Sequence, residues 1–211
     1  MEIIFRLISF LFLIISISLH EFFHSLAADY LGDPTPRSLG RLTLNPKAHL
    51  DPFGTIILPL INIFTGIPTI GWAKPVPIDP FNFRHPRRDE IIVSLAGPFA
   101  NLTIAITTAL ILRFIPFISP IIYQLGALMI LINISLFVFN LLPIPPLDGS
   151  HIFLNLLSPE SSHKWAEAFD HYGFVLLIIF VFLPIYQGQT ILSLIVSPLT
   201  KSIFHLLLPT L

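Results

Sequence analysis

The sequence contains no cysteine among its 211 residues, and only 11% of the residues are charged. The absence of cysteine excludes disulfides, thiolate metal ligands and a cysteine nucleophile, so any bound metal must use nitrogen and oxygen ligands. Soluble globular domains normally carry about 25% charged residues. Together with a hydrophobic fraction of 54% and a mean hydropathy of +0.84, the low charge indicates an integral membrane protein.

A strong positive charge is also absent. The chain has 11 Lys and Arg against 12 Asp and Glu, and the basic residues are spread thinly along it. The sequence therefore lacks the basic patch that nucleic-acid binding needs, and we expect no nucleic-acid partner. The length leaves room for a few membrane spans and short loops, without a sizeable soluble domain.

The first predicted span lies between Arg6 and Asp29. These about 22 residues make roughly 33 Å of helix, enough to cross a bilayer core of about 30 Å. A basic loop with Arg37, Arg41 and Lys47 follows. The positive-inside rule places this loop in the cytoplasm, so the amino terminus is expected to face out.

Three further spans are expected. The second covers residues 91–112, and after a proline-bearing turn at 114–119 the third returns over 121–142 to the cytoplasmic side. The fourth begins near Tyr172, and the sequence leaves open whether residues 185–211 cross again.

Residues 55–73 are apolar but broken by Pro59, Gly66 and Pro68, and basic residues flank them on both sides. Such a segment is expected to be re-entrant or interfacial, because both of its flanks favour the cytoplasm. The stretch GWAKPVPIDPFNF that follows from Gly71 alternates prolines with small or apolar residues, a pattern typical of extended chain at an edge. The expected fold is an all-α polytopic membrane protein with about four transmembrane helices plus a re-entrant or short β-like membrane-associated segment.

The motif HEFFH lies inside the first span. His20 and His24 are four residues apart, so a helix turns only about 40° between them and both imidazoles can bind one zinc ion. Glu21 lies about 100° further round, where it can reach a water molecule on the metal. His24 and His20 should lie roughly 7 Å and 13 Å below the cytoplasmic end of the helix. Ionisable side chains within a span are costly and usually mark a functional site.

A catalytic zinc ion needs a third protein ligand, with water as the fourth. Asp148 in PPLDGSH is the best candidate, because it follows a span that returns to the cytoplasmic side. Pro143, Pro145 and Pro146 should end the helix there, and Gly149 is expected to let the backbone turn sharply. The alternative for Asp148 is an ordinary turn carboxylate.

Several other residues have a functional and a structural interpretation. His49 could line the site and His151 could donate to a carboxylate, although an ordinary histidine is favoured for both. Asn101 lies in GPFAN, where Gly97 and Ala100 indicate close helix packing without chemistry. These residues stay outside the predicted site.

A cleaved signal peptide is an alternative for the start of the chain. Arg6 precedes an apolar run, and SLA at 25–27 loosely resembles a cleavage site. This interpretation is disfavoured, because the apolar region would have to contain His20, Glu21 and His24.

Five stretches in order, HEFFH, LNPKAHLDPFG, GWAKPVPID, LAGPFAN and NLLPIPPLDG, resemble the site-2 protease family of intramembrane zinc metalloproteases over roughly residues 1–157. The resemblance implies that three side chains bind one zinc ion: His20, His24 and Asp148. It also implies that Glu21 is the catalytic acid and base and that Asn140 holds the substrate or the developing oxyanion. Without the resemblance, Asn140 would be interpreted as a packing or capping residue. PDZ and CBS modules are not seen, so the sequence resembles a minimal member.

The resemblance predicts an enzyme that cuts single-pass transmembrane proteins near the cytoplasmic face of the cell membrane, as in regulated intramembrane proteolysis. Residues 1–211 would form a single domain, with a catalytic core at about 1–157 and a C-terminal membrane segment at about 172–211. The alternative is a membrane transporter or metal-handling protein with the same His/His/Asp site. The two differ over Glu21, because transit needs ligands whereas hydrolysis also needs a base.

Overall fold

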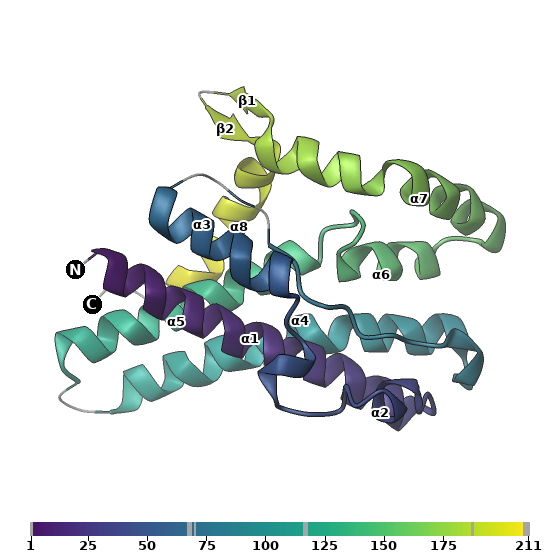
Figure 1. Ribbon diagram of the computed structural model, residues 1–211, viewed down its shortest axis with the longest axis horizontal. Coiled ribbons are helices and arrows are strands. Elements are labelled where there is room, and N and C mark those ends of the chain that lie inside the picture. Colours follow the sequence, from purple (N-terminus) through teal and green to yellow (C-terminus); the bar gives the residue numbers. More distant parts are fainter. Residues whose placement is uncertain (1, 67–68, 70, 116–117, 187, 209–211) are drawn as a thin grey trace.

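The computed structural model describes residues 2–66, 69, 71–115, 118–186 and 188–208. Among these residues, four helices are long and apolar enough to cross a membrane (Figure 1). They are α1 (Glu2–Leu31), α4 (Pro86–Phe114), α5 (Pro120–Asn140) and α7 (Pro159–Phe182). The prediction of an all-α polytopic membrane protein is therefore confirmed.

Shorter elements connect the long helices. The helical ones are α2 (Thr35–Ser38), a 3-10 helix (Pro46–Ala48), a π-helical turn (Pro52–Ile57), α3 (Leu58–Thr65), a second 3-10 helix (Pro80–Asn82), α6 (Asp148–Leu156) and α8 (Ile191–Leu207). The strands β1 (Pro184–Tyr186) and β2 (Gln189–Thr190) pair antiparallel in a small hairpin that follows α7 (Figure 1).

Helices α1, α4 and α7 extend beyond the predicted spans, and α7 does so most, whereas α5 ends at Asn140, two residues before the predicted end of the third span. The fourth span was expected to begin near Tyr172, but the helix already begins at Pro159. Ser158 precedes it as the N-cap, and its side chain accepts a hydrogen bond from the N–H of Ser161. Proline is favoured at the first helical position, so the polar segment before Tyr172 is helical as well.

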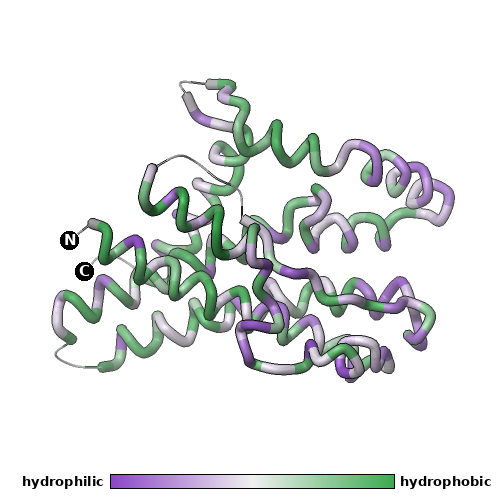
Figure 2. The backbone as a smooth tube through the Cα atoms, in the orientation of Figure 1, coloured by the Kyte–Doolittle hydropathy of each residue, from purple (hydrophilic) through white to green (hydrophobic). Residues whose placement is uncertain are grey.

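The outer surface of α1 is apolar. Ile3, Leu7, Leu11 and Ile15 recur every four residues, and each is between 39% and 54% exposed. Such a stripe suits contact with lipid, because lipid chains are as apolar as these side chains and expose them to no water. Figure 2 shows apolar residues predominating at the end that carries both termini and polar residues gathered at the opposite end, around α2 and the start of α7.

Helix α4 lies at the centre, since α1, α5 and α6 all pack against it. The main apolar core joins α4, α5 and the end of α8 through seven buried side chains: Ala105, Ala109, Leu112, Ile130, Ile134, Val138 and Leu208. Small residues on α4 let the neighbouring helix approach closely, as is common between membrane helices.

Among the described residues between α1 and α4, no helix is long enough to be a candidate span. The π-helical turn runs directly into α3, and their 14 residues span only about 21 Å. Helix α3 ends at Thr65, and the next residue, Gly66, has a φ of +74°, in the left-handed region that favours glycine. Pro68, predicted to break this segment, lies outside the described residues, as do positions 116 and 117 of the predicted turn at 114–119.

Asp33 joins the end of α1 to the chain that leads into α4. Its buried carboxylate accepts hydrogen bonds from the N–H of Thr35 (3.0 Å), the N–H of Asp79 (2.8 Å) and Nδ2 of Asn82 (2.9 Å). Burial alone would raise the pKa of Asp33, but the hydrogen bonds favour the charged form and lower that pKa below its ordinary value. The carboxylate thus stabilises the fold while it is ionised.

We predict that Asp33→Asn lowers the free energy of unfolding by about 1–3 kcal/mol at neutral pH, because buried donors lose a charged acceptor. The contribution of Asp33 is complete above its ordinary pKa of 3.8 and is lost as the pH falls through the lower folded-state value. Thermal unfolding in detergent should therefore separate the two proteins at pH 7 and bring them together in acid. The exposed Asp170→Asn is the control. A difference that does not change with pH would contradict this account.

Candidate metal centre

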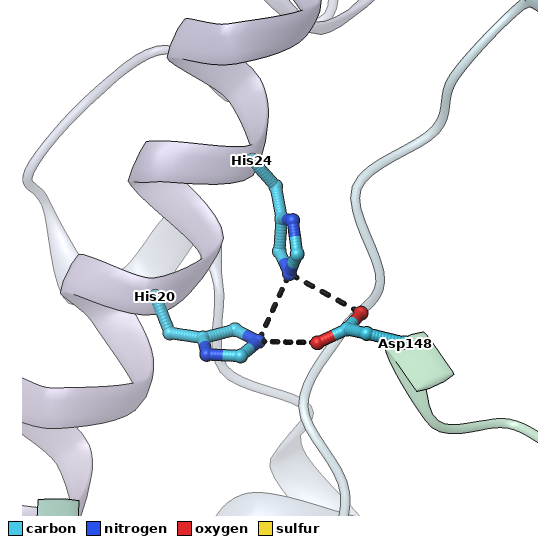
Figure 3. Close-up of side chains that lie close together, drawn as sticks. All are labelled: His20, His24 and Asp148. Atoms are coloured by element: carbon cyan, nitrogen blue, oxygen red, sulfur yellow. Dashed lines mark hydrogen bonds and ion pairs between the residues drawn. The ribbon is translucent and has the colours of Figure 1, made fainter. Parts of the chain in front are cut away.

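Three side chains from distant parts of the sequence meet in the interior. His20 and His24 project from α1 toward Asp148, the first residue of α6 (Figure 3). The two imidazole Nε2 atoms are 2.9 Å apart, and the Asp148 oxygens lie 3.1 Å from Nε2 of His20 and 3.3 Å from Nε2 of His24. All three ligand atoms lie within 4.8 Å of one another, as a shared metal ion requires.

The position of Asp148 depends on close backbone packing. The expectation that Gly149 allows a sharp turn is wrong, because the residue is helical and its φ is not positive. Instead, a Cβ at Gly149 would lie 2.4 Å from the carbonyl oxygens of Leu141 and Leu142. Glycine therefore lets the first turn of α6 approach the end of α5, which carries the Asp148 carboxylate into the bundle.

The outer nitrogens of both imidazoles are held by acceptors. Nδ1 of His20 lies 2.7 Å from Oδ1 of Asn101, and Nδ1 of His24 lies 2.7 Å from the carbonyl oxygen of Val93. Since these oxygens only accept, each Nδ1 carries the proton and donates it. Each Nε2 is then left with a lone pair that faces the other imidazole and Asp148.

This arrangement fits a zinc ion. Oδ2 of Asp148 is buried and has no hydrogen-bond partner among the described residues, although Nε2 of His20 is 3.1 Å away. Lone pairs and a carboxylate this close repel one another unless a cation lies between them. Tetrahedral zinc with bonds of about 2.0–2.1 Å separates neighbouring ligand atoms by about 3.3–3.4 Å, close to the distances found here.

Helix α4 leaves room for the two imidazoles at one position. A Cβ at Gly97 would lie 2.3 Å from Nε2 of His24 and 2.6 Å from Nε2 of His20. Val93, Gly97 and Asn101 are spaced four residues apart, so they share one face of α4, opposite the two histidines. The sequence interpretation of Gly97 as a packing residue missed this contact, although the spacing from Gly97 to Asn101 was visible in LAGPFAN.

Glu21 is buried beside the ligands, on α1. Burial lowers the pKa of the Arg41 guanidinium, and the negative charge of Glu21 opposes that shift. Glu21 therefore lies near the loop that carries Arg41. The same guanidinium donates to the carbonyl oxygen of Lys74, so this loop also contacts the chain before α4.

Two of the remaining candidates donate hydrogen bonds to backbone carbonyl groups. Nδ2 of Asn140 donates to the carbonyl oxygen of Leu136 one turn earlier in α5. Nε2 of the buried His49 donates to the carbonyl oxygen of Thr43 in its own loop.

His151 lies on α6 and bonds to Glu90 of α4. Its Nδ1 is 3.1 Å from Oε1 of Glu90. This hydrogen bond raises the pKa of His151 above its ordinary value, against the lowering effect of burial. The pair holds α6 against the start of α4, where it supports the position of Asp148.

Known proteins resemble this chain over most of its length. The model for peptidase family M50 matches residues 8–121 and 117–184. YwhC of Bacillus subtilis, described by its name as a candidate zinc metalloprotease, is 38% identical over 181 residues, which cover 82% of this chain and 79% of YwhC. Rip2 of Mycolicibacterium smegmatis, described in the same way, is 32% identical over 172 residues. These cover 81% of this chain and 65% of that protein.

Rip2 of Mycobacterium tuberculosis carries the same description and is 33% identical over 177 residues, which cover 83% of this chain and 66% of Rip2. The chain thus matches about two thirds of the length of either Rip2 protein. No solved structure matches the chain significantly.

We predict that Gly97→Ala weakens zinc binding at least about tenfold, because the added methyl group collides with both Nε2 atoms and must displace a ligand. Gly126→Ala is the matched control, since its Cβ would meet the side chain of Leu112 between α4 and α5, away from the ligands. Zinc content after purification and affinity in a chelator competition provide the measurement. Equal zinc binding by the two variants would show that the crowding at Gly97 is harmless.

Proposed function

The chain belongs to peptidase family M50, and on this premise we propose that it is an intramembrane zinc metalloendopeptidase acting on single-pass transmembrane proteins. One observation carries the proposal: two histidines from a membrane helix and a distant aspartate bring their ligand atoms within 4.8 Å of one another, with Glu21 buried beside them. Three protein ligands leave the fourth position of a zinc ion open, as hydrolysis requires.

His20, His24 and Asp148 would hold the zinc ion, which would supply Lewis-acid polarisation of the scissile carbonyl and would lower the pKa of a water molecule. Glu21 accepts the proton of the attacking water at its carboxylate and delivers it to the leaving amine. Asn140 is proposed to stabilise the developing oxyanion. One hydrogen of its Nδ2 bonds to Leu136, and the second remains for the substrate.

Charge supports a cytoplasmic location for the polar end of the bundle. α1 continues for about 10 Å beyond His24, and the basic side chains Arg37, Arg41 and Lys47 follow it. By the positive-inside rule, we propose that this end faces the cytoplasm and that cleavage occurs near that face of the cell membrane. We further propose that residues 1–211 act as a single domain, since Leu208 at the end of α8 packs into the α4–α5 core.

Glu21→Gln separates catalysis from metal binding. The variant should retain zinc, because all three ligands remain, and should lose about 10²–10⁴-fold in proteolysis, because it lacks the base. Purified protein is tested on single-pass peptides with and without a chelator. His24→Ala is the comparison and should lose zinc and activity together. Zinc transit, the other function that the ligands allow, needs no base. Normal cleavage by Glu21→Gln would therefore reject the protease mechanism.

We also propose that the segment from Lys74 to Asp79 holds the substrate in extended form. The N–H of Lys74 donates to His49, and the N–H of Asp79 donates to Asp33, so both ends are fixed. Within the described part of the chain, no backbone hydrogen bond joins residues 75–78 to another segment. Helical substrates hide their carbonyl groups, and pairing with this open edge would stabilise the unwound form.

Val76→Pro removes one N–H from this edge, between Pro75 and Pro77, which have none. We predict that it abolishes cleavage of a transmembrane substrate while zinc content stays unchanged. Val76→Ala is the matched control, because it shortens the side chain but keeps the donor. Unchanged activity in Val76→Pro would exclude strand pairing at this position.

A further inference from the structure

Ser16, Asn101 and Asn133 form a polar cluster where α1, α4 and α5 meet. All three are fully buried, at 0% exposure, within helices that span the membrane. Polar side chains at such depth are costly and usually have a function. Neither Ser16 nor Asn133 is one of the three residues that form the metal centre.

The cluster is connected to the metal centre through one amide. Oδ1 of Asn101 accepts from Nδ1 of His20 at 2.7 Å. On its other side, Nδ2 of Asn101 donates to Oδ1 of Asn133 at 3.0 Å and to the carbonyl oxygen of Ser16 at 3.3 Å. Both amide hydrogens of Asn101 are thus used, and they point away from the histidine.

Hydrogen bonds also fix the orientation of the Asn133 amide. Its Nδ2 donates to Oγ of Ser16 and to the carbonyl oxygen of Met129, each at 2.9 Å, and also approaches the Met129 sulfur at 3.2 Å. Oδ1 of Asn133 is left to face Asn101. If either amide rotated by half a turn, the NH2 groups or oxygens of the two asparagines would face each other, in a place without water to compensate.

The orientation of Asn101 determines which nitrogen of His20 is protonated. With Oδ1 toward the ring, Nδ1 carries the proton and Nε2 presents a lone pair to the metal. With Nδ2 toward the ring, Nδ1 would have to accept, and Nε2 would carry a proton pointing into the metal site. The partner of the outer nitrogen therefore controls whether His20 can act as a ligand.

We propose that Asn133 is a positioning residue for the zinc ligand His20 and that it acts through Asn101. The inference rests on the zinc site of the proposed function. Asn133 keeps the Asn101 oxygen toward His20, and Ser16, one helical turn before His20, holds both amides from α1.

The test is a double-mutant cycle on zinc affinity with the full chain purified in detergent. Zinc affinity is measured by competition with a chelator, and the visible spectrum of the Co²⁺-loaded protein reports ligand geometry. Asn101→Leu should weaken zinc binding by about 10–100-fold, the usual loss when the partner of a ligating histidine is removed. Asn133→Leu should weaken it by about tenfold and change the Co²⁺ spectrum in the same way.

The double variant should bind zinc no more weakly than Asn101→Leu alone, because Asn133 has no other route to His20. Thr108→Val is the matched control, since its hydroxyl also lies in α4 and bonds to the carbonyl oxygen of Ile104 in the same helix. It should keep the zinc affinity and spectrum of the unsubstituted protein.

Unchanged zinc affinity in a folded Asn133→Leu, or losses that multiply in the double variant, would overturn the inference. If Asn133→Leu does not fold, Ser16→Ala takes its place, because it removes one acceptor of Asn133 and leaves both amides. Full zinc affinity in Ser16→Ala would then count against the inference. Failure of the unsubstituted protein to bind zinc would instead reject the proposed function.

Discussion

The arrangement of the bundle depends on one unfavourable contact. Two imidazole lone pairs and a carboxylate lie about 3 Å apart in a buried site, where their repulsion is weakly screened. A zinc ion between His20, His24 and Asp148 would make such a cluster favourable. The surrounding helices supply what the cluster needs, namely acceptors for the outer nitrogens, space beside the inner ones and a carboxylate from another part of the chain.

Helix α4 meets these needs with three residues that follow one another at intervals of four. Val93 offers a backbone carbonyl, Gly97 offers the absence of a side chain, and Asn101 offers an amide oxygen. The same helix packs against α5 and α6. Helix α4 therefore positions both Asn101, the partner of His20, and α6, which begins at Asp148. This explains why GPFAN lies at the centre of the fold.

The sequence predicts those parts of the structure that depend on side chains in a local pattern. It does not predict those that depend on backbone groups or on tertiary packing. The i, i+4 spacing of His20 and His24 needs only helical geometry, and the long apolar segments predict the four spanning helices directly. The role of Val93 is carried by its carbonyl, which every residue has, so no pattern could reveal it. Gly149 was assigned a turn because glycine often makes one, whereas its contact with Leu141 depends on tertiary packing. Asn133 was visible as a polar residue within a span, but its partner required the register between α4 and α5.

Hydrolysis within a membrane also needs a route for water, and the exposure of α6 suggests where it lies. Asp148 is the most accessible ligand, with its side chain 19% exposed against 8% for His20 and 7% for His24. Three residues further along the same helix, His151 is 53% exposed. Helix α6 thus reaches from the metal centre toward the surface of the bundle. A water molecule would therefore reach the metal centre most readily on the side of Asp148, the least buried of the three ligands.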